Sequence, residues 1–279
     1  MADEVAHDEP IVIKFGLEEA SAPQVARLRL SMILWGKPGD GKTTLASTAP
    51  GMKLWINFDP DGTDALFARA ADKGDIIVLD LSGKNHTAAS RMKEDNPYGI
   101  EKVLKDHPEI ETVVLDSLTS FAEIATDNAV AGNKNSTHET PGQNGYTWRN
   151  ALVRKCFVNV LRVTKKFDKH FIAICHEKEV YNTDGSVDEY TLSLSSSLIQ
   201  QLCLMAGEVW NIRKTEKGER FAAVASCRKR APMKTRMFKV GKVPEFQLTY
   251  DADTYEGVEL ADIYNEWKNG GGRKIDFPK

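Results

Sequence analysis

Residues 28–50 have the sequence LRLSMILWGKPGDGKTTLASTAP. Within this stretch, residues 36–43 (GKPGDGKT) match the phosphate-loop pattern G-x-x-x-x-G-K-[ST] at every required position. The apolar residues 32–35 before the pattern predict a β-strand, and residues 44–46 after it predict a short helix that ends by Pro50. A strand, a glycine-rich loop and a helix in this order predict a binding site for the phosphates of a nucleotide.

The loop is predicted to hold phosphate through both its backbone and its side chains. The glycines allow backbone N–H groups to turn toward the β-phosphate, and the following helix directs its free N–H groups at the same anion. Lys42 is predicted to bridge the β- and γ-phosphates, and the Thr43 hydroxyl to hold Mg²⁺. The loop residues predicted to contact the nucleotide are Gly36, Pro38, Gly39, Asp40, Gly41, Lys42, Thr43 and Thr44.

The composition is typical of a soluble protein. Of 279 residues, 41% are hydrophobic and 28% are charged, and the net charge of −3 means that any contact with nucleic acid must come from a local basic patch. The four cysteines have no C-x-x-C spacing, which predicts reduced thiols in the cytoplasm. No apolar run approaches membrane-spanning length, and the first ten residues, MADEVAHDEP, are acidic. We therefore expect a cytoplasmic protein without membrane contact.

Strands alternate with helices through most of the chain, and antiparallel strands follow near its end. The further strands predicted before the basic segment are 53–58, 75–79, 112–116 and 171–176, and then 209–213 and 221–227, which form a hairpin. We expect an α/β fold with a mostly parallel central sheet flanked by helices and an antiparallel C-terminal hairpin extension.

Three parts of the chain are expected. Residues 1–27 form either an N-terminal arm or an edge strand. Residues 28–242 form the nucleotide-binding core, and residues 243–279 form a C-terminal helix followed by a flexible, glycine-rich tail.

Polar side chains stand at the carboxyl ends of the predicted parallel strands, where α/β proteins bind ligands. They are Asp59, Asp116 and His176. Asp116 ends a buried strand, and this arrangement has the form of a Walker B motif. Asp116 is predicted to hold Mg²⁺ together with Thr43. A capping role for Asp116 at the next helix is compatible with this assignment.

Two polar segments, residues 132–146 and 177–190, are predicted to be long loops.

A basic segment, residues 228–242 (RKRAPMKTRMFKVGK), contains seven basic residues and no acidic residue. Uncompensated charge of this kind predicts a nearby anion, namely the phosphates of ATP, those of DNA, or both. Beside the first polar segment, Trp148 is expected to pack on a helix face, and Tyr146 either packs or stacks on an unpaired base.

Together, these residues resemble the RecA-like P-loop ATPases, especially the phage-encoded single-strand annealing and recombination ATPases. The resemblance covers residues 29–240 and rests on the phosphate loop, VVLD (113–116), FDPDG (58–62) and RKRAPMK (228–234). It implies a RecA-like core that binds ATP with Mg²⁺.

The resemblance also implies roles for individual residues. Asp61 corresponds to the acidic residue that activates water, although a turn carboxylate in Asp-Pro-Asp-Gly is the alternative. His176 corresponds to the polar residue that senses the γ-phosphate, the alternative being an ordinary histidine at a strand end. Arg228 and Arg230 correspond to cations that act on a neighbouring subunit's ATP. The fallback pair for that role is Lys234 and Arg236.

The function implied by this resemblance is an ATPase that binds single-stranded DNA as a homo-oligomer, a filament or a ring with ATP at subunit interfaces, and promotes annealing or recombination. A single-strand DNA-binding protein is a further expected partner, and the host cytoplasm is the expected location of a phage-encoded member. Two alternatives remain. One is a P-loop switch or remodelling ATPase that acts on a protein, and the other is a small-molecule kinase.

Overall fold

The computed structural model describes two short strands, residues 12–15 and 18–21, and most of the chain after them. The described residues beyond these strands are 28–60, 66, 73–83, 91–92, 99–131, 141–249 and 257–278. Statements below apply to this part of the chain.

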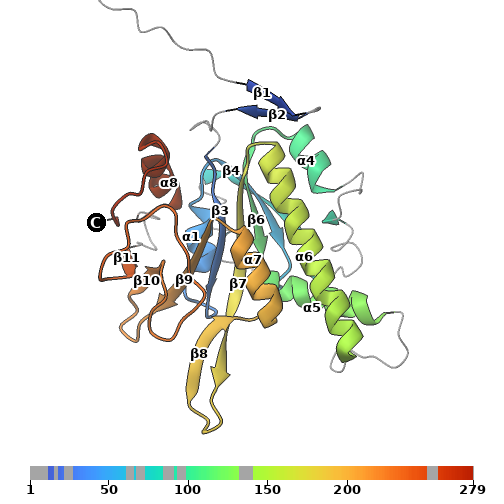
Figure 1. Cartoon of the computed structure of the whole chain (residues 1–279), viewed down its shortest axis with the longest axis vertical. Coiled ribbons are helices and arrows are strands. Elements are labelled where there is room, and N and C mark those ends of the chain that lie inside the picture. The colour runs from blue at the N-terminus through green and yellow to red at the C-terminus, as the bar shows by residue number, and fades with distance from the viewer. Residues whose placement is uncertain are drawn as a thin grey trace, which may run out of the picture.

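A central sheet runs through the molecule (Figure 1). Its strand order is β11 (Glu245–Leu248), β10 (Arg220–Ala223), β9 (Glu208–Lys214), β3 (Ser31–Gly36), β7 (His170–Tyr181), β6 (Ile110–Asp116), β4 (Met52–Asn57) and β5 (Ile76–Asp80). In this order, the strands β9, β3, β7, β6, β4 and β5 are parallel to one another. β10 pairs antiparallel with both β9 and β11. An additional strand, β8 (Val187–Leu192), pairs with the outer part of β7.

Helices cover both faces of this sheet (Figure 1). One face packs against α1 (Lys42–Ser47) and α8 (Leu260–Asn269), and the other against α4 (Ile100–Asp106), α5 (Leu118–Val130), α6 (Gly142–Lys166) and α7 (Ser196–Met205). Because helices cover both faces, the residues of the central strands are buried on both sides, and the strands are therefore continuous apolar runs. In β3, five of the six residues are buried. None of the described helices combines the length and apolar composition needed to cross a membrane.

The predicted α/β class, the mostly parallel sheet and the antiparallel C-terminal hairpin are confirmed. One predicted loop is wrong in part, and the other is wrong over most of its length. Residues 142–146 belong to the first turns of α6, since helix packing extends further than the apolar pattern suggests, and residues 132–140 lie outside the described residues. Most of residues 177–190 forms a hairpin of β7 and β8, because backbone pairing stabilises strands even where the side chains are polar and exposed.

The structure adds detail at the two ends of the chain. Near the N-terminus, β1 (Val12–Phe15) and β2 (Glu18–Ser21) form a two-stranded sheet of their own instead of an edge of the central sheet. Near the C-terminus, β11 joins the central sheet, so a boundary at residue 243 does not separate a structural unit. The segment after α8 is packed rather than free, because Ile275 is buried and its N–H bonds to Met237.

Candidate nucleotide site

The phosphate loop connects β3 to α1 at the carboxyl end of the parallel strands. Gly36 ends β3 so close to β9 that a Cβ atom on it would lie 2.0 Å from the carbonyl oxygen of Ile212. Any side chain here would collide with the neighbouring strand, so the loop can start at this place only with glycine. At the far end of the loop, Gly41 has φ +99° and precedes α1.

Lys42 places its ammonium group inside the loop. Its Nζ donates hydrogen bonds to the carbonyl oxygens of Gly36 (3.0 Å) and Lys37 (2.8 Å), and the residue is only 5% exposed. Burial lowers the pKa of Lys42, while the carboxylates of Asp116 and Asp40 act in the opposite direction. A phosphate beside this ammonium would offset part of the cost of its burial.

Thr43 of α1 and Asp116 of β6 meet although β3, the strand that leads into α1, is not a neighbour of β6. β7 lies between β3 and β6, yet Thr43 Oγ1 donates to Asp116 Oδ2 at 3.1 Å. Burial, and then the nearby charge of Asp59, raise the pKa of Asp116 to about 6. Mg²⁺ prefers oxygen ligands such as a hydroxyl and a carboxylate, and phosphate oxygens can complete its coordination shell. Thr43 and Asp116 therefore fit a Mg²⁺ ion that is bound together with a nucleotide.

Asp59 is the acidic residue that the sequence interpretation left without a role. Its carboxylate accepts hydrogen bonds from the hydroxyls of Ser117 (3.1 Å) and Ser120, and it lies 3.4 Å from His176 Nε2. Burial alone would raise the pKa of Asp59, but the contacts with His176 and the two serines hold it below its usual value. Its position after a strand placed it at the ligand-binding edge of the sheet, but only the structure shows its contacts with His176 and the two serines. Asp61 lies outside the described residues.

The phosphate loop also contacts the β7–β8 hairpin. Lys37 Nζ bonds to Glu179 Oε1 at 2.9 Å and lies 5.3 Å from the ring centre of Tyr190. His176 pairs with Gly36 in the register of β7 and β3, and its backbone N–H donates to Thr119 Oγ1 at 3.0 Å. His176 thus stands between the loop and the hairpin.

The two proposed trans-acting arginines lie in different surroundings. Arg230 Nε donates to the buried carboxylate of Glu177 at 3.2 Å, and its guanidinium lies 4.3 Å from the ring centre of Tyr190, so its side chain is only 15% exposed. Arg228 bonds to Glu245 at 3.2 Å, and its side chain is 63% exposed. Arg230 is therefore engaged within its own chain, whereas Arg228 faces outward.

The fallback pair lies away from the loop. The Lys234 ammonium donates to the carbonyl oxygens at the end of α7, those of Cys203, Leu204 and Ala206, and so caps that helix. Arg236 is exposed, and its backbone N–H donates to Glu208, a residue that pairs with the opposite end of β3.

Arg220 is a site residue that the sequence interpretation missed. A Cβ atom on Gly41 would lie 3.0 Å from its Cδ and 3.1 Å from its Nε, and within the described part of the chain this Nε is buried without a hydrogen-bond partner. A cavity of about 190 Å³ lies beside it, lined by Gly41, Thr44, Leu45, Thr48, Arg220, Leu248, Thr249 and Val258. Only the pairing of β10 with β9 and β11 brings Arg220 here, so no local motif marks it.

A family model described as an AAA domain matches residues 28–236, about three quarters of the chain. The chain therefore belongs to this AAA-domain family and is an AAA-type P-loop ATPase. No curated protein matches the sequence.

The contact between Gly36 and β9 leads to a prediction. Gly36→Ala is expected to lower the free energy of unfolding by about 3 kcal/mol, because the methyl group overlaps a backbone oxygen that cannot move without breaking the β3–β9 pairing. Gly241→Ala is the control, since a Cβ atom there meets nothing within 4 Å, and it should change stability by less than about 0.5 kcal/mol. Urea unfolding of both variants measures this, and equal stabilities would contradict the interpretation.

Proposed function

We propose that this chain binds ATP with Mg²⁺ in the phosphate loop and hydrolyses it through residues at or after the ends of β3, β4 and β6, together with His176 of β7. The observation that carries the proposal is the buried ammonium of Lys42 beside the Thr43–Asp116 pair. Lys42 neutralises charge on the β- and γ-phosphates, and Thr43 and Asp116 hold the metal. Bound Mg²⁺ would supply charge neutralisation and a fixed orientation of the phosphates.

Asp61 is proposed to polarise the attacking water, and Asp59 to hold His176 in place. The hydrogen bonds from two serines keep the Asp59 carboxylate charged and fix its orientation toward His176 Nε2. His176 in turn adjoins the first residue of the phosphate loop through the β3–β7 register. A change in the γ-phosphate region therefore has a direct route to the β7–β8 hairpin.

The cavity beside Arg220 is proposed to hold the nucleoside part of ATP. It begins at Gly41 and Thr44, immediately next to the loop, and its walls include the apolar side chains of Leu45 and Leu248. The planar guanidinium of Arg220 is suited to lie against an aromatic base.

Two substitutions separate binding from turnover. Lys42→Ala is expected to weaken ATP binding and to lower kcat at least about a hundredfold, because it removes the cation between the phosphates. Asp61→Asn should lower kcat by a similar factor and leave the Kd for ATP unchanged, because a water-activating group acts only in the reaction. Fluorescent-nucleotide titration and phosphate release measure both quantities. Lys217→Ala, in an exposed turn, is the control and should change neither quantity. Undiminished hydrolysis by Lys42→Ala would contradict the assignment of the phosphate loop as the ATP site.

A third substitution tests the nucleoside cavity. Arg220→Gln is expected to raise the Kd for ATP about tenfold, because the base loses its contact with the guanidinium. Binding of inorganic tripolyphosphate, which has no base, should stay at the level of the unsubstituted protein. Competition against a fluorescent nucleotide measures both affinities, with Lys217→Gln as the charge-matched control. An equal loss for both ligands, or no loss for ATP, would contradict a nucleoside contact.

Single-stranded DNA is the proposed partner of the oligomeric ATPase, and annealing or recombination its proposed task. Supporting this, Tyr146 and Trp148 near the start of α6 are 46% and 69% exposed, and Tyr181 in the hairpin is 59% exposed. The expectation that Trp148 packs on a helix face is therefore wrong. Figure 1 shows that the start of α6 and the β7–β8 hairpin lie toward the same end of the molecule. Exposed aromatic rings at this end are suited to stack on unpaired bases. Arg228 is proposed as the cation given to a neighbouring subunit.

The ATPase rate with and without single-stranded DNA, measured together with size in solution, tests this proposal. We expect the oligonucleotide to raise the rate and to promote assembly, and Trp148→Ala to reduce the stimulation by weakening base stacking. Leu204→Ala, also at a strongly exposed apolar position, is the control. A rate and a size that do not respond to DNA would favour the alternative of a switch ATPase with a protein partner. Transfer of phosphate to an added metabolite would indicate a kinase.

A further inference from the structure

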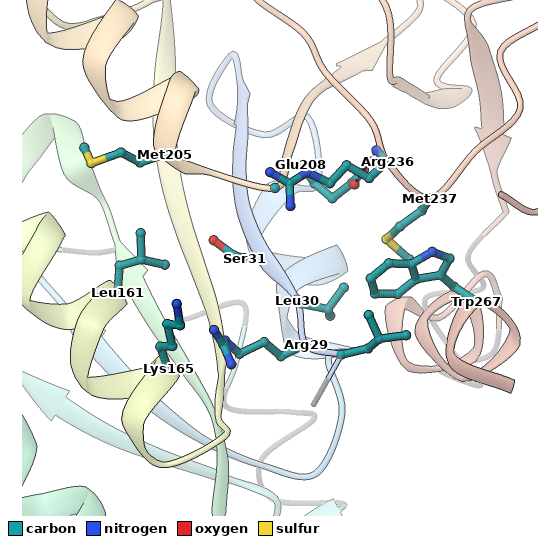
Figure 2. A pocket seen from close by; sticks show the side chains of 12 residues that line it. Arg29, Leu30, Ser31, Leu161, Lys165, Met205, Glu208, Arg236, Met237 and Trp267 are labelled. Carbon is teal, nitrogen blue, oxygen red and sulfur yellow. Dashed lines mark hydrogen bonds between the residues drawn. The ribbon is translucent and has the colours of Figure 1, made fainter. Parts of the chain in front are cut away.

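A second cavity, of about 360 Å³, lies at the end of β3 opposite the phosphate loop (Figure 2). Leu30 and Ser31 line it at the start of the strand, whereas Gly36 begins the phosphate loop at the other end. Five residues of extended strand separate these ends by roughly 16 Å. The cavity is therefore distinct from the nucleotide site.

Three basic side chains from separate parts of the chain line this cavity. Arg29 precedes β3, Lys165 belongs to the last turn of α6, and Arg236 belongs to the basic segment. In Figure 2, the Ser31 hydroxyl is seen between the guanidinium of Arg236 on one side and the charged ends of Arg29 and Lys165 on the other. Among the described residues, this hydroxyl is buried and has no hydrogen-bond partner.

The acidic groups nearby do not balance this charge. Glu208 is the only acidic residue among the described residues that line the cavity, and its carboxylate already accepts from Trp210 Nε1 (2.8 Å) and the backbone N–H of Arg236 (2.7 Å). Arg29 lies 3.6 Å from Asp168, whose side chain is 58% exposed. The Arg29 side chain is 21% exposed, so its charge is partly removed from water, and this burial lowers its pKa.

We propose that this cavity binds a phosphate group, carried either by a strand of single-stranded DNA or by a free phosphorylated molecule. Two guanidinium groups and an ammonium group match phosphate oxygens, and the Ser31 hydroxyl is able to donate to the same anion. Leu161, Met205 and Met237 also line the cavity, which suits the carbon-rich part of such a ligand. The volume lies within the usual range of small-molecule sites. The proposal does not depend on ATP hydrolysis at the phosphate loop.

The test combines Arg236→Gln with Lys165→Gln, both in a Lys42→Ala background in which the phosphate loop is disabled. Both side chains are exposed, so their substitution should leave the fold intact, and thermal unfolding checks this. The probes are a fluorescent oligodeoxythymidine and inorganic pyrophosphate, titrated separately. We expect at least about tenfold weaker binding of one or both probes, and for the oligonucleotide a smaller salt dependence, because fewer phosphates are neutralised.

Lys155→Gln in the same background is the matched control. Lys155 is exposed on the same helix, ten residues before Lys165 and therefore about 15 Å away along its axis. Weakening of the oligonucleotide alone identifies DNA as the source of the phosphate, and weakening of pyrophosphate alone identifies a free ligand. Three results would overturn the proposal. The first is undiminished binding of both probes, the second is no binding of either probe before the double substitution, and the third is an equal loss of binding with Lys155→Gln.

Discussion

The site depends on the position of one buried cation, the Lys42 ammonium. It is held by the carbonyl oxygens of Gly36 and Lys37, and these oxygens face it only because the chain turns at the end of β3. The turn begins where Gly36 touches the backbone of β9 at Ile212, too closely for any side chain. The pairing of β3 with β9 therefore sets the shape of the phosphate loop, and the loop sets the place of the cation.

The strand order then decides which residues surround this cation. Because β7 lies between β3 and β6, the point where its pairing with β3 ends brings His176 and Glu177 beside the loop, and Asp116 reaches Thr43 past this part of β7. The same strand continues outward into the hairpin, where Glu179 bonds to Lys37. An ion pair thus links the loop to the hairpin, and β7 runs without a break from beside the loop into the hairpin. This is the physical basis for proposing that the state of the nucleotide is transmitted to the hairpin.

The basic side chains of residues 228–242 lie in several different surroundings. Arg230 is paired with Glu177 near the phosphate loop, Arg228 faces outward beside Glu245, and Lys234 caps α7. Arg236 lies at the opposite end of β3 and lines the second cavity. These four basic residues, close together in the sequence, thus lie in different surroundings, because the segment is irregular and passes over several elements.

The sequence by itself determined the α/β class, the phosphate loop and the strand that ends in Asp116, because these depend on local apolar runs and on glycines at fixed spacing. It also placed Asp59 just after a strand end, where ligands bind, whereas the expected strand end at His176 is wrong because β7 continues to Tyr181. Only the tertiary structure decided that Asp59 contacts His176, that Arg220 lies against Gly41, and that Arg29, Lys165 and Arg236 share a cavity. These contacts join residues distant in sequence through strand pairing and helix packing, and no local pattern of residue types encodes which distant segments will meet.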